Sequence, residues 1–193
     1  FDEIKEQFHL TDDDFRGIES TGDETVSCRK KIALKPKQIE ALSKICGKEN
    51  ISTDDYDRLK YSSGKTVEEA MNLRSGKPGP VSDAVIHPRT KDEILKIVKL
   101  CDREKIPVYV YGGGSSVNFG LRPSMGGVTI VMSTHMNKIL ELNELNQTVT
   151  VEAGIMGPAL EKSLNSAREI FKTEYNYTCG HFPQSFEYSS AGG

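Results

Sequence analysis

The chain has 193 residues, of which 36% are hydrophobic and 27% charged, and its formal net charge is −3. No apolar run approaches the roughly 18 residues that a membrane-spanning helix needs, so the composition predicts a soluble globular protein without a transmembrane segment. Residues 1–24 carry a net charge of −7 and the remaining residues +4. Because this mildly basic body has no stripe of Lys and Arg interleaved with aromatic residues, the charge pattern also excludes a nucleic-acid-binding module.

The cysteines and the N-terminus give three further expectations. Cys28, Cys46, Cys101 and Cys179 match no zinc-ligand spacing, so we expect no metal site. Scattered single thiols favour a reducing compartment. Phe1 is neither an initiator Met nor the start of a charged-then-apolar leader, so we expect a trimmed or internal piece that shows no targeting signal.

The first eighty residues are expected to form an accessory N-terminal segment that is partly helical. Residues 1–35 have no clean periodicity, and the run Asp12-Asp13-Asp14 is typical of a turn, a linker or an exposed face. Three short helical stretches follow, each opened by a proline or a capping residue, over 36–46, 54–59 and 66–71. The second is capped by Asp54 or Asp55. The Gly/Pro-rich residues 75–80 end the segment.

Beyond Pro80 the expected elements alternate between strand and helix. Residues 84–86 form a short apolar strand, and Thr90 with Glu93 makes a capping box that opens a helix ending near Lys105. The buried stripe of this helix comprises Ile94, Ile97, Val98 and Cys101. The next strand, 108–111, completes a unit whose spacing predicts a right-handed βαβ crossover. Residues 128–132 add a third strand.

After the third strand the pattern becomes antiparallel. Residues 139–143 and 148–152 are expected to pair as two short strands around a turn. Residues 157–167 form an amphipathic helix, and 175–193 form a loop with little regular structure. The fold class is therefore α+β, with a small βαβ subdomain followed by a mixed or antiparallel subdomain.

One segment carries the clearest chemistry, and it comprises Val110, Tyr111, Gly112, Gly113, Gly114, Ser115 and Ser116. Three glycines after a buried strand allow a sharp turn, and successive N–H groups in such a turn bind anions such as a diphosphate. A tight turn without a ligand fits the glycines equally well. A Rossmann loop is excluded, because Val117 stands where its third glycine belongs and no helix follows. A Walker A loop would need Lys-Ser or Lys-Thr, which is absent at that distance.

Four collinear pieces of the sequence resemble the FAD-binding domain of the vanillyl-alcohol oxidase and p-cresol methylhydroxylase (PCMH-type) family. They are DAVIHP at 83–88, VYVYGGGSSV at 108–117, TVEAG at 150–154 and GHFPQSFEYSSAGG at 180–193. Each piece is weak alone, but the four at these spacings are specific. The resemblance implies a PCMH-type domain that binds FAD, with residues 81–193 as its front portion, truncated at the C-terminus, and 1–80 as the accessory segment.

Within this family the chain most resembles the alkyldihydroxyacetonephosphate (alkylglycerone-phosphate) synthases. Residues 134–139, THMNKI, resemble their S-x-M-N-R-I stretch, and 152–161, EAGIMGPALE, resemble their E-A-G-I-x-G-x-x-L-E. The resemblance covers about residues 54–193. It implies an ether-lipid enzyme that exchanges the acyl group of acyl-dihydroxyacetone phosphate for a fatty alcohol, through a flavin adduct. The 193-residue fragment alone is expected to be inactive.

The resemblance carries two cofactor-binding stretches onto this chain. The family's P-I-G-G-G-T-S diphosphate loop falls on residues 110–116, where Ser115 replaces Thr. Its flavin-contacting stretch D-S-L-E-F-S-T falls on Gln184, Ser185, Phe186, Glu187, Tyr188, Ser189 and Ser190. Gln184 replaces the family's Asp, and Phe182 stands where the family has Glu, so two carboxylates beside the flavin are lost. The catalytic residues are unknown.

Further expectations follow from the same resemblance. Relatives that attach FAD through this loop carry His where this chain has Ser115, so the resemblance implies noncovalent FAD. It also implies a small-molecule or lipid substrate and a homodimer. Any contact with a membrane is expected to be peripheral. The expected location is the cytoplasm, or the peroxisome in a eukaryote. His181 fits a flavin contact and an ordinary turn equally well, and Cys179 is expected to be packed rather than reactive.

Two other functions stay open at this point. The same scaffold serves FAD-linked oxidoreductases that act on a 2-hydroxy acid or an alcohol, and a fold does not settle a function. The second alternative is a non-catalytic fragment, because the sequence shown ends before the rest of the FAD domain and any substrate domain.

Overall fold

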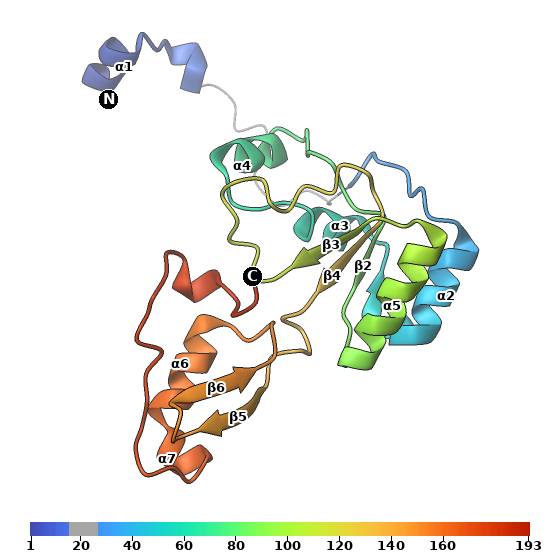
Figure 1. Ribbon diagram of the computed structural model, residues 1–193. Helices are drawn as coiled ribbons and strands as arrows, with labels where there is room; N and C mark the ends of the chain where they lie inside the picture. Colours follow the sequence, from blue (N-terminus) through green and yellow to red (C-terminus); the bar gives the residue numbers. More distant parts are fainter. Residues whose placement is uncertain (16–26) are drawn as a thin grey trace.

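A four-stranded sheet organises the first part of the fold in the computed structural model, which describes residues 1–15 and 27–193 (Figure 1). Its strands are β1 (Ile51–Ser52), β2 (Ala84–Ile86), β3 (Val108–Tyr111) and β4 (Val128–Val131). They lie in the order β1-β2-β4-β3, with β2 and β3 parallel to β4 and β1 antiparallel to β2. The expected third strand is therefore central: it separates β2 from β3, so the β2–α5–β3 crossover joins strands that are not neighbours.

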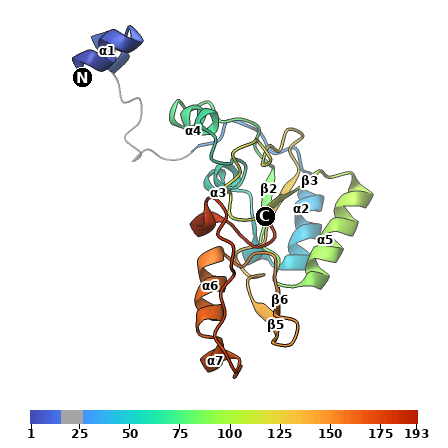
Figure 2. The ribbon, with the colours of Figure 1, turned by 60° about the vertical axis from the view of Figure 1, so that its left-hand side comes forward.

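The strands are apolar because both faces of the sheet are covered. Successive side chains of a strand point to opposite faces. Ala84, Ile86, Val128 and Ile130 pack with residues of two helices, α2 (Pro36–Cys46) and α5 (Lys91–Glu104), which lie side by side in Figure 2. Val85, Val131 and Tyr111 pack on the other face with Leu121 and Tyr61. The α+β fold class is confirmed, with the core of this unit between the sheet and its two helices.

Helix α5 departs from its expected pattern in two places. The Thr90 hydroxyl accepts from the Glu93 N–H at 3.2 Å, but the Glu93 carboxylate accepts from the N–H of Arg89, at 2.8 Å, rather than from that of Thr90. The expected capping box is therefore only half formed. Val98 is 44% exposed and Leu100 is buried, because the face that meets α2 is centred on Ile97 rather than on the Ile94–Val98 edge.

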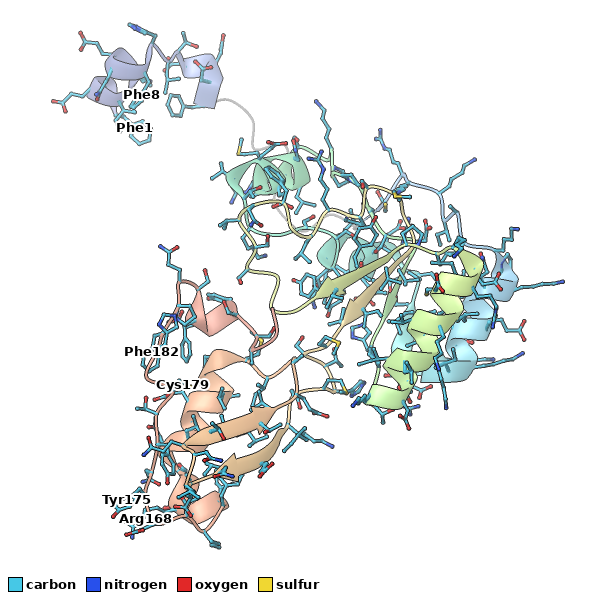
Figure 3. All side chains as sticks on the ribbon, viewed as in Figure 1. Phe1, Phe8, Arg168, Tyr175, Cys179 and Phe182 are labelled. Atoms are coloured by element: carbon cyan, nitrogen blue, oxygen red, sulfur yellow. The ribbon has the colours of Figure 1, made fainter. Side chains whose placement is uncertain are left out.

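The accessory helices follow the expected pattern, with one addition. They are α2, the 3-10 turn η2 (Lys48–Asn50), α3 (Asp55–Lys60) and α4 (Val67–Arg74). Asp54 caps α3, and its carboxylate accepts from the Asp57 N–H at 3.0 Å. The sequence pattern showed no sign of α1 (Asp2–Phe8), whose neighbour is the 3-10 turn η1 (Asp12–Phe15). The exposed Phe1 and Phe8 belong to this segment (Figure 3).

The second part of the fold is built on a hairpin, as predicted. Strands β5 (Ile139–Asn143) and β6 (Thr148–Val151) pair antiparallel. The expected helix divides at Ser166 into α6 (Gly157–Asn165) and α7 (Ala167–Ile170). The tail then runs back along α6, where the Glu161 carboxylate accepts from the Cys179 N–H at 2.8 Å (Figure 3). It ends in a 3-10 turn, η3 (Phe186–Tyr188), and a single bridge between Met156 and Ser190.

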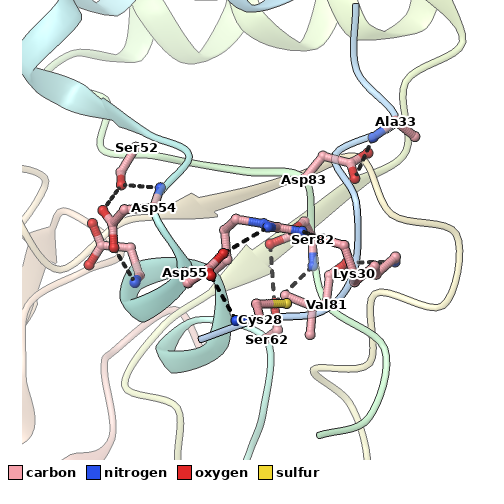
Figure 4. Close-up of polar contacts among 12 residues, drawn as sticks. Cys28, Lys30, Ala33, Ser52, Asp54, Asp55, Ser62, Val81, Ser82 and Asp83 are labelled. Atoms are coloured by element: carbon pink, nitrogen blue, oxygen red, sulfur yellow. Dashed lines mark hydrogen bonds and ion pairs between the residues drawn. The ribbon is translucent and has the colours of Figure 1, made fainter. Parts of the chain in front are cut away.

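A buried arginine joins the accessory segment to the sheet. Arg58 is only 2% exposed, and its guanidinium donates to the carbonyls of Ser82 (2.9 Å) and Lys30 (2.8 Å) and to the carboxylate of Asp55 (3.2 Å). Figure 4 shows these partners around the start of β2. In the described ranges, no helix is both long enough and apolar enough to cross a membrane.

Candidate cofactor-binding site

The glycine loop, residues 112–116, directly follows strand β3 and packs against the side chain of the last residue of that strand, a tyrosine. Tyr111 is the last residue of β3 and is buried. Its hydroxyl lies against Gly114, so that a Cβ at Gly114 would overlap it, and Gly114 has a φ of 73°. Burial raises the pKa of Tyr111, which keeps this hydroxyl neutral. Gly114 is thus required both by its φ and by the close approach of the ring.

The two stretches that the sequence assigned to the cofactor meet at this loop. The Ser115 and Ser189 hydroxyls are 3.2 Å apart although 74 residues separate them. A Cβ at Gly113 would overlap the carbonyl of Tyr188, and one at Gly112 would overlap the Ser190 hydroxyl. The end of the chain accordingly lies beside the end of β3 (Figure 1). Glycine at these positions is what allows the two stretches to touch.

The loop offers hydrogen-bond donors that the protein does not use. Within the described ranges, the backbone N–H groups of Gly113, Gly114, Ser115 and Ser116 donate to no protein acceptor. The Ser190 hydroxyl, which lies against the neighbouring Gly112, is buried and has no hydrogen-bond partner in the part of the chain that the structure describes. Buried polar groups normally find a partner, and successive free amides of this kind form an anion site. The donor set therefore suits a phosphate or diphosphate.

Backbone hydrogen bonds hold the second stretch in place. The N–H groups of Gly157, Ala191 and Gly192 donate to the carbonyls of Ser189 (3.0 Å), Ile155 (2.9 Å) and Ala153 (2.9 Å). A Cβ at Gly157 would also come within 2.6 Å of the Phe186 ring. Residues 153–157, between β6 and α6, thus form the support for Ser189 and Ser190.

Several of the predicted site residues lie away from this meeting point. Val110 is 60% exposed on the edge strand, and Tyr188, which is 68% exposed, contacts the loop through its carbonyl. Gln184 and Glu187 are exposed. Ser185 has a φ of 59°, and its carbonyl accepts from the Ser189 hydroxyl at 2.8 Å. Phe186 packs edge-on against Phe182, with ring centroids 4.9 Å apart.

Three residues of the accessory segment contact the glycine loop without having been predicted. The Tyr61 ring packs edge-on against Tyr111, with centroids 5.0 Å apart, and the Lys65 N–H donates to the Ser116 carbonyl at 2.7 Å. Gly64 lies so close to that carbonyl that a Cβ would overlap it. Among the sequence signals, only the family resemblance, which covers about residues 54–193, includes this segment. At the same end of the loop a hollow opens, lined in part by Ser63, Asn72, Phe119 and Arg122.

Cys179, His87 and His135 are held by contacts within the fold. Burial, followed by the Glu161 carboxylate, raises the pKa of Cys179 to about 11, so its thiol stays protonated and poorly nucleophilic. His87 hydrogen-bonds Thr134 at 2.7 Å, and burial lowers its pKa. His135 bonds the side chain of Asn50 at 2.8 Å, a partner that the sequence did not reveal. His181 is exposed.

The curated proteins similar to this chain are named as synthases, oxidases and dehydrogenases. It is 28% identical to the alkyldihydroxyacetonephosphate synthase of Trypanosoma brucei brucei over 164 residues, which is 83% of this chain and 25% of that protein. It is 30% identical to glycolate oxidase subunit GlcD of Bacillus subtilis (strain 168) over 154 residues, 80% of this chain and 29% of that protein. The chain thus spans about a quarter of the length of these relatives.

Solved structures show the same fold. A structure of an alkyldihydroxyacetonephosphate synthase matches with a TM-score of 0.77 at 24% identity, over 92% of this chain and 32% of that one. A structure of p-cresol methylhydroxylase matches with a TM-score of 0.57 at 18% identity, over 68% of this chain and 24% of that one. The PCMH-type fold expected from the sequence is confirmed. Because the family model described as "FAD binding domain" matches residues 82–193, more than half of the sequence, the chain belongs to that FAD-binding family.

Proposed function

We propose that this chain is the FAD-binding part of an alkylglycerone-phosphate synthase-like flavoenzyme, and that it holds the diphosphate of FAD on the glycine loop. The observation that carries the proposal is that, among the described residues, the amide N–H groups of Gly113 to Ser116 have no acceptor and the buried Ser190 hydroxyl, which lies against Gly112, has no partner. Charge-assisted hydrogen bonds to such donors are the strong ones. When bound, FAD would supply an electron-accepting ring system.

The residues of this chain have distinct proposed tasks. The amides of Gly113 and Gly114 bind phosphate oxygens, since they have no acceptor among the described residues. The Ser190 hydroxyl donates a further hydrogen bond from below. Ser115 and Ser189, whose hydroxyls are 3.2 Å apart, join the two stretches and orient them toward the same ligand. These tasks require no charged residue, so the affinity comes from oriented dipoles.

We also propose that FAD is held without a covalent bond. The relatives that attach FAD through this loop carry His where this chain has Ser115, and a serine hydroxyl does not provide that linkage. Denaturing the purified full-length protein with acid should release its flavin into the supernatant. Flavin that stays with the precipitated polypeptide contradicts this part of the proposal.

The similarity to synthases from several organisms supports the ether-lipid activity. The test uses the full-length protein, supplied with acyl-dihydroxyacetone phosphate and a long-chain alcohol. The expected result is an alkyl ether of dihydroxyacetone phosphate, detected by mass spectrometry, with no net change in the flavin spectrum. A protein that binds FAD but makes no ether product contradicts the synthase assignment.

A second candidate, an FAD-linked oxidoreductase acting on a 2-hydroxy acid or an alcohol, has its own support. Phe182 and Gln184 replace two carboxylates that the synthase resemblance places beside the flavin, and both residues are exposed on the tail. The chain is also similar to a glycolate oxidase subunit. Anaerobic bleaching of the visible flavin absorption by a 2-hydroxy acid would favour this candidate, whereas a spectrum inert to such acids would exclude that substrate class.

The remaining partners belong to the same proposal. A small-molecule or lipid substrate follows from either candidate enzyme. A homodimer, contact with a membrane surface, and a cytoplasmic or peroxisomal location stay predictions from the family resemblance.

A further inference from the structure

A turn of the accessory segment packs against the glycine loop and hydrogen-bonds to it. The turn comprises Ser62 to Thr66, between α3 and α4, and it touches the loop at Ser116. There the Lys65 N–H donates to the Ser116 carbonyl at 2.7 Å, and Gly64 packs against the same carbonyl so closely that a Cβ would overlap it. The carbonyl of Ser116 is thereby turned toward the accessory segment.

The turn itself is held rigidly. The Glu69 carboxylate accepts from the N–H of Gly64 at 2.9 Å and from the N–H and hydroxyl of Thr66 at 3.1 and 2.9 Å. At its other end, the Ser62 hydroxyl accepts from the Ser82 N–H at 3.0 Å. Both ends of the turn are therefore fixed, one to α4 and one to the residues that lead into β2.

An aromatic contact links the accessory segment to Tyr111, the residue that precedes the glycine loop. The Tyr61 ring packs edge-on against Tyr111 (5.0 Å between centroids, 87° between planes) and against His87 (5.4 Å, 76°). Edge-to-face packing at this separation is favourable and directional. The Tyr111 hydroxyl packs against Gly114. A change in the orientation of the Tyr61 ring would therefore move Tyr111 and, with it, the middle of the glycine loop.

We propose that Tyr61 and Gly64 are positioning residues for the diphosphate loop: they fix the conformation in which its amide N–H groups point toward the ligand. This inference rests on the proposed function. The carbonyl of each peptide unit points opposite to its N–H, so holding the Ser116 carbonyl toward Lys65 fixes the peptide unit between Ser116 and Val117, at the end of the row of amides from Gly113 to Ser116. The accessory segment thus contributes to cofactor affinity without touching the cofactor.

The test uses the full-length protein. It compares substitutions that disturb the contacts of Gly64 and Tyr61 with matched controls. Gly64→Ala adds a methyl group against the Ser116 carbonyl, whereas Gly79→Ala adds one where no atom lies within 4 Å. Neither glycine has a positive φ, so backbone strain does not distinguish them. Tyr61→Leu removes the edge-on ring, and Tyr61→Phe keeps it.

The readout is the dissociation constant of the apoprotein for three probes: FAD, ADP and riboflavin. Gly64→Ala and Tyr61→Leu should weaken FAD and ADP binding by about tenfold or more, the effect of one displaced charge-assisted hydrogen bond. Riboflavin, which has no phosphate, should bind as it does to the wild type. Gly79→Ala and Tyr61→Phe should leave all three constants unchanged.

The outcomes separate this inference from the proposed function. A wild-type protein that binds no FAD overturns both. A wild type that binds FAD, with Gly64→Ala and Tyr61→Leu binding FAD and ADP equally well, overturns the positioning role alone. Riboflavin affinity that falls as much as ADP affinity, or an apoprotein that no longer folds, would also overturn it, because the residues would then support the general structure rather than the loop.

Discussion

Single residues at the site divide into those that a sequence pattern can reveal and those that it cannot. Gly112 to Gly114 were predictable, because a glycine run directly after an apolar strand is typical of a tight turn or an anion-binding loop. The burial of Arg58 was not predictable, because arginine is normally exposed and its partners at Lys30 and Ser82 are distant in sequence. His135 and Asn50 likewise meet only through the tertiary fold.

The buried guanidinium of Arg58 leads to a stability prediction. Arg58→Ala leaves the carbonyls of Lys30 and Ser82 without their donor, and each unsatisfied buried group is costly. We expect the free energy of unfolding to fall by about 2–4 kcal/mol, measured by urea denaturation of the purified chain. The control is Arg103→Ala, whose side chain is exposed and, among the described residues, pairs only with Glu104; it should change stability by less than about 0.5 kcal/mol. Equal effects of the two substitutions would contradict the structural role of Arg58.

Among the secondary-structure elements, helices were more predictable than the order of the strands. The limits of α2 and α5 follow from local signals: apolar spacing, a proline or threonine at the start, and Gly47 or Lys105 at the end. The position of β4 between β2 and β3 depends on pairing between distant segments, which no local pattern encodes. The helix α1 was missed because its seven residues have no buried face.

The turn before α4 leads to a prediction for the effect of pH. Although burial disfavours the charged form, hydrogen bonds from Gly64 and Thr66 lower the pKa of Glu69 below its ordinary value. A carboxylate with a lowered folded-state pKa adds stability that is present above its ordinary pKa and is lost as pH falls through the lowered one. Glu69→Gln should therefore flatten the acid side of the stability curve, measured as melting temperature below pH 4.5.

Glu68 is the matched control for this prediction. It is the exposed neighbour of Glu69 in the first turn of α4. Glu68→Gln should leave the acid dependence of the melting temperature as it is in the wild type. If both substitutions flatten the curve equally, the effect comes from the general charge of the helix rather than from the hydrogen bonds of Glu69.

Across the whole molecule, the accessory segment is in close contact with the FAD-binding domain. Strand β1 pairs with β2, α2 packs beside α5, and Arg58 and Tyr61 reach the sheet and the glycine loop. The division at residue 80 remains a prediction from composition. The family and its fold could be predicted because four short motifs keep their order and spacing. The contacts between the segments could not, because they join residues whose neighbours in sequence carry no shared pattern.

The most direct test of the central claim is a titration of the apoprotein with FAD, comparing the wild type with Gly113→Ala. An added methyl group at Gly113 would overlap the Tyr188 carbonyl. It would therefore push apart the two stretches, 110–116 and 184–190, that meet at the loop. We predict that the wild type binds FAD and that Gly113→Ala weakens binding by about a hundredfold, with Gly79→Ala unchanged. FAD binding that is equally tight in Gly113→Ala and the wild type would contradict the claim that this loop holds the cofactor.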